Sequence, residues 1–366
     1  MNSKIKNYVT LLLLSLFIFG FAAANVLIPD ENISKTERRA LAQFPKITAA
    51  DIINGKFMSD FEKYTLDQFP FRDSFRSMKA FSNYYLLRRR DNNGIYIADG
   101  SAVKMEYPLD TNSVKHATDR FAYVYRKYME EKDVRVYFSV IPDKNYFTAP
   151  KNGYLYMDYD KLIRQMSASM DFAHYIDIFD TLDISNYYKT DSHWRQEKIT
   201  DTAASLAEAM DAGITSDYNE VCVNMPFYGV YYGQAALPMK PDALCYLENE
   251  QMNSCKVYDF ETDTYIPVYD TSKAGSADPY EMFLSGSKSL LTIENPYVGS
   301  DKELIMFRDS FGSSLAPLLV SGYAKITLVD IRYISPELLD RFIDFESQDV
   351  LFLYSASVLN HSITLK

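Results

Sequence analysis

The residues best suited to chemistry lie in two short segments, YYKTDSHW (187–194) and RDSFG (308–312). In the first, Asp191 precedes His193 by two positions, so its carboxylate can bind one imidazole nitrogen and stabilise the imidazolium. In the second, Ser310 follows an apolar strand and begins a helix, whose free N–H groups can stabilise an oxyanion. Serine needs a base within hydrogen-bond reach to act as a nucleophile. Together the segments predict a Ser–His–Asp triad.

Both segments also have a structural interpretation. Asp191 or Ser192 could cap a helix beginning near Trp194, and Asp309 or Ser310 could cap the next helix. Taken singly, each capping interpretation is the simpler one, so the triad depends on the two segments meeting in space. The remaining histidines lie in helical or strand-like contexts without such neighbours, and we expect them to be structural: His116, His174 and His361.

Four further side chains are weaker candidates for substrate binding or an oxyanion contact: Arg332, Tyr354, Lys144 and Trp194. Three of them follow or end apolar strands, where functional groups of open α/β sheets collect. Each has an alternative: a salt bridge from Arg332 to Asp330, a core position for Tyr354, and a solvated Lys144. Trp194 could stack on a sugar ring or pack beneath the neighbouring imidazole.

Apolar strands that alternate with helices predict an α/β fold with a mostly parallel sheet covered on both faces. Residues 134–141 form one such strand, and ELIMF, KITLVDI and DVLFLYS form three more, separated by the helical segments FGSSLAPLLVSG and PELLDRFIDF. Helices are also expected over 112–131, 160–170 and between Trp194 and Met210, with a strand in HYIDIF. Residues 94–99 predict a hairpin or strand.

Two regions stand apart from this rhythm. Residues 29–100 form an N-terminal, largely helical part, in which apolar spacing from Phe57 to Phe81 predicts two short amphipathic helices interrupted near Pro70. Residues 215–285 are rich in Tyr, Pro and Asn with poor periodicity, which predicts an insertion of strands and loops.

Composition limits the classes of function. The chain has 366 residues, 47% hydrophobic and 24% charged, as is typical of a globular protein. A net charge of −11 argues against a nucleic-acid partner. Cys222, Cys245 and Cys255 lack metal-binding spacing, so we expect no metal site, and we expect no cofactor. One disulfide among them is possible in an oxidising compartment, and free thiols are the alternative.

An uncharged run from Val9 to Ile28 begins the chain after Lys4 and Lys6. About 20 apolar residues suffice to cross a membrane, and the lysines favour a cytoplasmic N-terminus. Residues 1–28 therefore predict a single-pass anchor, with 29–366 as one domain outside the cytoplasm. The small residues at 22–24 also suit a signal peptidase, which would release a secreted domain.

The segment YYKTDSHW resembles the signature of the DHHW protein family, with Ser192 at the first histidine of that name. The stretches ERRALAQFP, FEKYTLDQFPFRD, IPDKNYF, FLSG, RDSFGSSLAPLL and VDIRY resemble other elements of the family in the expected order. The resemblance therefore covers nearly the whole chain after the apolar run. Arg308 departs from it, because Gly or Lys is more familiar before the D-S pair.

The family is similar to the alginate O-acetylation proteins, whose SGNH-hydrolase-like domain transfers acetyl groups to an extracellular polysaccharide. The resemblance implies a three-layer α/β/α fold in which Asp191 orients the base, His193 is the general base and Ser310 is the nucleophile. Because the Asp–His pair precedes the serine, it also implies a rearranged SGNH topology. It places the protein at a bacterial cell membrane.

The leading prediction is an O-acetyltransferase that modifies a secreted or cell-wall polysaccharide. One membrane span cannot import acetyl groups, so the resemblance implies a membrane-bound O-acyltransferase partner that supplies them. A carbohydrate esterase would use the same residues with water as the acceptor. The alternative from another class is a non-catalytic glycan-binding or envelope-assembly protein on the same scaffold.

Overall fold

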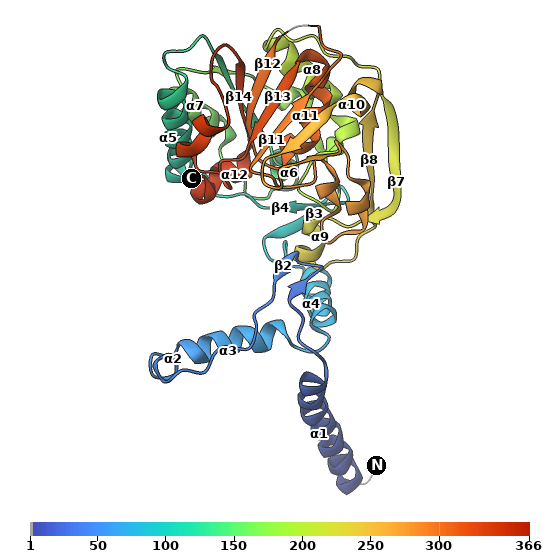
Figure 1. Cartoon of the computed structure of the whole chain (residues 1–366). Coiled ribbons are helices and arrows are strands. Elements are labelled where there is room, and N and C mark those ends of the chain that lie inside the picture. The colour runs from blue at the N-terminus through green and yellow to red at the C-terminus, as the bar shows by residue number, and fades with distance from the viewer. Residues whose placement is uncertain (1–2, 300) are drawn as a thin grey trace. The chain divides into compact units, whose positions relative to one another are not determined.

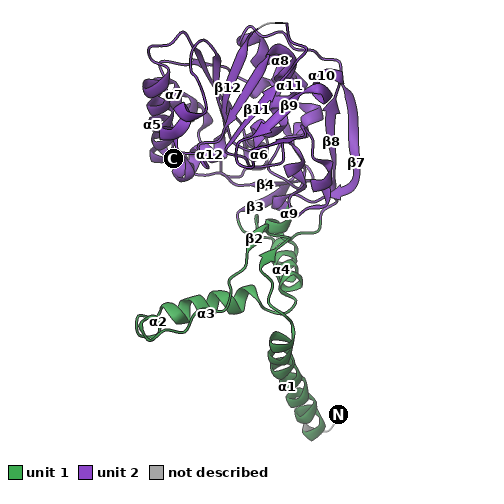
Figure 2. Ribbon diagram, in the orientation of Figure 1, with its two compact units in different colours: residues 1–93, 232–238 green, residues 94–231, 239–366 purple. Residues whose placement is uncertain are grey.

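The computed structural model describes residues 3–299 and 301–366, which divide into two compact units. Figure 1 shows the chain, and Figure 2 colours its units. The first unit comprises Met1–Asn93 with Tyr232–Pro238, and the second comprises Gly94–Tyr231 with Met239–Lys366. That residues 29–366 act as one domain outside the cytoplasm stays a prediction.

The first unit is mainly helical. Its elements are α1 (Ser3–Leu27), β1 (Ile33–Ser34), β2 (Arg39–Ala40), α2 (Ala49–Ile53), α3 (Lys56–Asp67), α4 (Arg72–Phe81) and a π-helical turn (Ser82–Leu86). The break between α3 and α4 contains Pro70, as predicted, because proline cannot donate the backbone hydrogen bond that a helix interior requires. In the described part of the chain, α1 is the one helix long and apolar enough to cross a membrane, and it fits a membrane anchor.

The second unit is built on an eight-stranded sheet. Its order is β10–β9–β11–β13–β12–β14–β5–β6. The bounds are β5 (Arg135–Ile141), β6 (His174–Tyr175), β9 (Lys256–Asp259), β10 (Thr264–Ile266), β11 (Leu290–Glu294), β12 (Glu303–Arg308), β13 (Lys325–Val329) and β14 (Asp349–Ser355). Pairing is parallel from β13 to β6 and antiparallel through β11, β9 and β10. The predicted mostly parallel sheet is confirmed, and an antiparallel edge extends it.

Helices cover both faces of this sheet, because its strands are apolar on both sides. In β14, Leu351 and Leu353 belong to one core and Val350 and Phe352 to the other. The first core includes side chains of α8 (Thr200–Ala209) and α11 (Phe311–Leu319), and the second includes those of α5 (Thr111–Tyr128) and α7 (Tyr159–Ser169). These helices flank the sheet in Figure 1. The three-layer α/β/α architecture is therefore confirmed.

Shorter elements complete the second unit: hairpin β3–β4 (Ile95–Ala98, Ser101–Lys104), α6 (Lys144–Asn152), hairpin β7–β8 (Asn219–Phe227, Asp242–Glu248), α10 (Glu250–Ser254) and α12 (Ala356–Asn360). Helix α9 (Val230–Ala235) begins with residues of the second unit and ends with residues of the first. Residues 215–285 thus contain one hairpin and also two strands, β9 and β10, that belong to the central sheet.

One local prediction, the helix over PELLDRFIDF, was wrong. PELLDRFIDF forms a 3₁₀ segment over Pro336–Arg341, in which Pro336 and Leu339 are the buried residues. Ile343 and Phe345, which follow it, are also buried. Their two-residue spacing places both side chains on one face of an extended segment and not of a helix. The predicted strand in HYIDIF is confirmed as β6, which has only two residues and lies at the edge of the sheet.

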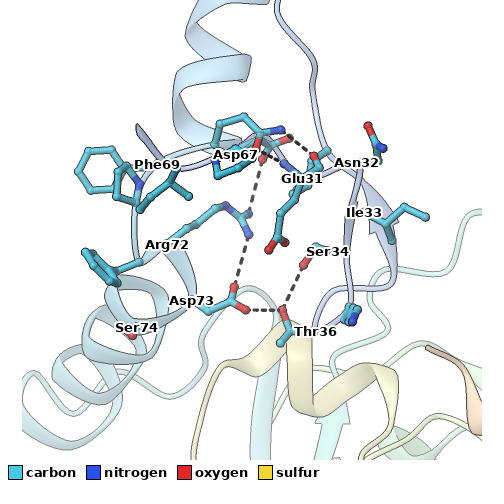
Figure 3. A pocket seen from close by; sticks show the side chains of 17 residues that line it. Glu31, Asn32, Ile33, Ser34, Thr36, Asp67, Phe69, Arg72, Asp73 and Ser74 are labelled. Carbon is cyan, nitrogen blue, oxygen red and sulfur yellow. Dashed lines mark hydrogen bonds and ion pairs between the residues drawn. The ribbon is translucent and has the colours of Figure 1, made fainter. Parts of the chain in front are cut away.

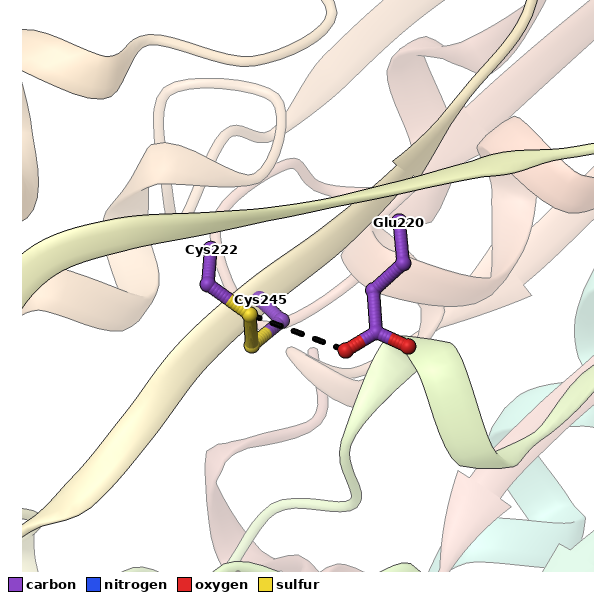
Figure 4. Close-up of side chains that lie close together, drawn as sticks. All are labelled: Glu220, Cys222 and Cys245. Atoms are coloured by element: carbon purple, nitrogen blue, oxygen red, sulfur yellow. Dashed lines mark hydrogen bonds between the residues drawn. A yellow bond between two sulfur atoms is a disulfide. The ribbon is translucent and has the colours of Figure 1, made fainter.

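The three cysteines form one disulfide and leave one free thiol. Cys222 and Cys245 face each other across the β7–β8 hairpin and form a disulfide, and Cys255 is a free thiol. Figure 4 shows Glu220 beside this disulfide. The three side chains lie within 4.8 Å of one another, but thiolates, not disulfide sulfurs, are the metal ligands.

Candidate active site

The structure brings the three predicted catalytic side chains into one hydrogen-bonded chain. His193 Nδ1 lies 2.6 Å from Asp191 Oδ1, and His193 Nε2 lies 2.7 Å from Ser310 Oγ. The Asp191 side chain is fully buried and that of His193 is 12% exposed. This is the geometry in which a carboxylate orients an imidazole that can take the proton of the serine.

The capping interpretation of the first segment does not describe its fold. Residues 187–194 form a tight turn, closed by a bridge between Tyr187 and Trp194 and by the Tyr188 N–H donating to the His193 carbonyl (3.1 Å). The next helical turn begins at Gln196, and its N-cap is Arg195. The Asp191 carboxylate therefore serves the turn and the imidazole rather than a helix end.

The chain packs so closely against Asp191 that only glycine fits beside it. The Val230 N–H donates to Asp191 Oδ2 (2.8 Å), and the His193 N–H donates to Oδ1 (3.0 Å). A Cβ at Gly229 would lie 2.2 Å from Asp191 Cβ and 2.4 Å from Oδ2. Gly229 is thus required by close approach, and the sequence alone gave no sign of it.

Asp242, at the start of β8, holds the residues just before the triad. Its carboxylate accepts hydrogen bonds from the N–H groups of Lys189 (2.9 Å) and Thr190 (2.8 Å) and from the Thr190 hydroxyl (2.6 Å). The Gly229 N–H donates to the same hydroxyl (2.9 Å). The β7–β8 hairpin therefore supports the turn that carries His193.

Lys144 supports this turn from within the protein. Its ammonium group is buried and donates to the backbone carbonyls of Tyr188 (2.8 Å), Lys189 (3.2 Å) and Asp191 (2.9 Å). Burial lowers the pKa of Lys144 to about 7, against the opposing influence of nearby carboxylates. The structure thus places Lys144 behind the turn of residues 187–194, where it binds backbone carbonyls, and not at a solvated edge.

Ser310 stands between β12 and α11, as the sequence predicts. It is the N-cap of α11 by position, but its side chain bonds His193 and makes no capping hydrogen bond. Asp309 takes over the local role: its buried carboxylate accepts from the N–H groups of Phe311 (3.0 Å) and Ser355 (2.8 Å). The turn that carries Ser310 is thereby fixed to the end of β14.

Arg308, which departs from the family pattern, is fully buried beneath this turn. It forms an ion pair with Asp330 (3.7 Å), and burial lowers its pKa. A Cβ at Gly312 would lie 2.7 Å from Arg308 Cβ. The large side chain is therefore accommodated because the first turn of α11 contains a glycine.

Aromatic rings hold the imidazole in its plane. Tyr280 stacks on His193 with ring centroids 3.8 Å apart and an angle of 11°. The Tyr280 hydroxyl lies 2.8 Å from Ser314 Oγ, to which Trp194 Nε1 also donates (2.8 Å). Trp194 is fully buried and contacts Phe311 edge to face. Trp194 thus packs beneath the site, and Tyr280 is a neighbour that the sequence did not indicate.

The other candidates have partners of their own. Arg332 forms the salt bridge considered as its alternative, donating to both Asp330 oxygens (2.8 and 2.6 Å). Tyr354 is 1% exposed and stacks on Phe121. Two of the remaining histidines bond elsewhere, His116 to Ser362 and His361 to Glu106, and His174 lies on β6.

The second unit thus combines a three-layer α/β/α fold of the SGNH-hydrolase-like kind with a hydrogen-bonded serine, histidine and aspartate. A model of the DHHW protein family matches residues 141–329, which is just over half of the chain, so the chain belongs to the DHHW family. No curated protein sequence matches it.

Three solved proteins are similar to the chain. A DHHW family protein from Eubacterium siraeum is 20% identical, with a TM-score of 0.58, and the match covers 74% of this chain and 93% of that one. PatB1 from Bacillus cereus, also solved with a sulfonyl adduct, is 17% identical, with a TM-score of 0.58 and coverage of 72% and 96%. The O-acetyltransferase domain of Pseudomonas putida AlgJ is 13% identical, with a TM-score of 0.43 and coverage of 73% and 92%. At these identities the two higher-scoring matches show a shared fold.

Proposed function

We propose that this chain is an acyl-transfer enzyme acting outside the cytoplasm, an O-acetyltransferase for a secreted or cell-wall polysaccharide. The observation that carries the proposal is the continuous hydrogen-bond chain from Asp191 through His193 to Ser310, with steps of 2.6 and 2.7 Å. A serine that merely capped a helix would have no reason to meet an imidazole that a buried carboxylate orients.

The geometry supports a two-step reaction. Ser310 Oγ attacks the acetyl carbonyl and gives its proton to His193 Nε2, while Asp191 stabilises the imidazolium through Nδ1–H. The first N–H groups of α11 are already bonded, that of Phe311 to Asp309 Oδ1 (3.0 Å) and that of Gly312 to the Asp309 carbonyl (3.1 Å), so we assign the oxyanion contact to no particular group. The imidazolium then protonates the leaving group. In the second step a sugar hydroxyl gives its proton to His193 and attacks the acetyl carbonyl, and as the bond to Ser310 Oγ breaks the imidazolium returns that proton to the serine.

The chain's location and partner follow from the same proposal. Helix α1 would anchor the protein in a bacterial cell membrane with residues 29–366 outside the cytoplasm, or precede a cleaved, secreted form. The Cys222–Cys245 disulfide agrees with an oxidising compartment. A membrane-bound O-acyltransferase would supply the acetyl groups, since one span cannot transport them.

The test is covalent labelling of the serine. We expect a fluorophosphonate to modify Ser310 in the full chain, located by mass spectrometry of the labelled peptide. Ser310→Ala should abolish labelling, and Ser167→Ala, a matched change of an exposed serine on α7, should retain it. A chain that binds glycan but takes no label, or takes it equally in Ser310→Ala, would instead be a binding protein.

Transfer and hydrolysis are then separated by the acceptor. An acetyl-labelled chain is incubated with polysaccharide or with buffer alone. An O-acetyltransferase moves the label to the polysaccharide, whereas a carbohydrate esterase, which shares these residues, releases acetate at the same rate in both.

A further inference from the structure

Helix α4 has the opposite orientation to an ordinary surface helix. Its apolar side chains recur at three-residue spacing, and they are exposed: Phe75 by 37%, Met78 by 63% and Phe81 by 48%. Its arginines, Arg72 and Arg76, have side chains only 18% exposed. Because helices in water bury their apolar face, the outer face of α4 is suited to an apolar environment.

The charged face of α4 is occupied by partners within the same unit. Arg72 and Arg76 both pair with Glu37 (2.5 and 3.2 Å), and Arg76 also donates to the Gly233 carbonyl (2.8 Å). Figure 3 shows Arg72 between Asp67 and Asp73, along the wall of a cavity of about 710 Å³. These ion pairs fix the rotation of α4, so its apolar stripe cannot turn inward.

Exposed apolar side chains extend over the whole region that follows α1. Among the described residues, sixteen large hydrophobic side chains are exposed between Ile28 and Leu87, against ten in the entire second unit, of which six are tyrosines. Phe71 and Leu87 are each 65% exposed. Apolar surface of this density marks a site of contact with another molecule or with a membrane.

Contacts with α1 favour a membrane over another molecule as the partner of this apolar surface. Phe21 of α1 stacks on Phe69 (5.4 Å between ring centroids) and meets Phe75 edge to face (5.6 Å). Phe21 lies six residues before the end of α1 at Leu27, which is about 9 Å along a helix axis. Lipid that surrounds α1 at this level therefore also surrounds the exposed faces of Phe69 and Phe75.

Basic residues follow the apolar ones. Arg88, Arg89 and Arg90 are exposed and come directly after Leu86 and Leu87, which are 70% and 65% exposed. Apolar side chains next to a cationic cluster are typical of segments that lie in the headgroup layer and attract anionic lipid.

We propose that residues 28–90, here called the collar, lie in the headgroup layer at the C-terminal end of α1, with the lipid bilayer as their partner. The apolar stripe of α4 and Phe71 enter the boundary between headgroups and acyl chains, and Arg88–Arg90 face the phosphates. The membrane thereby contacts the protein over the collar as well as through the span. This inference does not depend on the proposed acetyltransferase activity.

The test places a fluorophore at the collar of the full-length chain. Phe71→Trp and Met78→Trp are each reconstituted in vesicles of phosphatidylcholine and phosphatidylglycerol, with brominated lipid as the quencher and no other protein present. Native Trp194 is fully buried and supplies a constant background. The matched control is Tyr265→Trp, at a position of the second unit that is 68% exposed.

We expect brominated lipid to remove most of the added emission from both collar positions and none from the control. Unquenched tryptophan at both collar positions would overturn the proposal, and the collar would then face water or a second membrane protein. Quenching equal to that of the control would overturn it as well, because it would reflect general association with vesicles.

Discussion

The substitution Gly229→Ala tests whether the position of Asp191 sets the activity, because it adds one methyl group and removes no polar atom. The new Cβ would lie 2.2 Å from Asp191 Cβ, whereas ordinary contacts begin near 3.4 Å, so the two segments must separate by more than 1 Å. A misplacement of about 1 Å in a catalytic group costs on the order of 10²-fold in rate. That loss corresponds to about 2.7 kcal/mol in the activation free energy.

The assay is the rate of Ser310 labelling by a fluorophosphonate, together with hydrolysis of an acetyl ester, at matched protein concentration. Gly213→Ala is the control, since a Cβ there meets no atom within 4 Å. We expect Gly213→Ala to match the wild type and Gly229→Ala to retain a folded second unit by circular dichroism. Wild-type rates in a folded Gly229→Ala would refute the claim that close approach at Asp191 positions the base.

Three further predictions concern Lys144, Asp143 and the cysteines. Lys144→Met removes the group that donates hydrogen bonds to three backbone carbonyls. It should therefore lower the free energy of unfolding by about 3 kcal/mol and slow the labelling of Ser310. Wild-type values for both would contradict the role assigned to Lys144. Burial raises the pKa of Asp143 to about 7, above its ordinary 3.8, so the folded state keeps a proton that the unfolded chain releases. The free energy of unfolding should therefore fall as pH rises from about 4 to about 7, and Asp143→Asn, measured by urea denaturation at both ends, should lack this slope. Replacing Cys222 and Cys245 by Ser should lower the free energy of unfolding by about 3 kcal/mol, because the disulfide closes a loop between them. Alkylation at about pH 8 should modify little thiol in the unreduced protein, because burial raises the pKa of Cys255 to about 12.

The sequence sufficed where the signal is local. Apolar runs such as DVLFLYS predict strands buried on both faces, and β14 is buried along its whole length. Asp191 and His193 are two residues apart, so their contact needs only a tight turn. Placing Ser310 after a strand is equally local, because the carboxyl ends of parallel strands meet at one edge.

The supports of the site could not be predicted in the same way. Gly229, Asp242 and Tyr280 reach it from a stretch with little periodicity, and nothing in their immediate neighbours distinguishes them from loop residues. Lysine side chains are usually solvated, and Lys144 is buried because three carbonyls of one turn point toward its ammonium group. Such convergence depends on tertiary packing, which a single sequence does not display.

The partial exposure of Ser310 and His193 bears on how large an acceptor molecule can be. Ser310 and His193 are both partly exposed, whereas Asp191 is fully buried. For an enzyme of the proposed kind, a long polymer can approach sideways and present a hydroxyl from the middle of its length. Modification then needs no free chain end, so acetyl groups can be distributed along a strand that is already assembled.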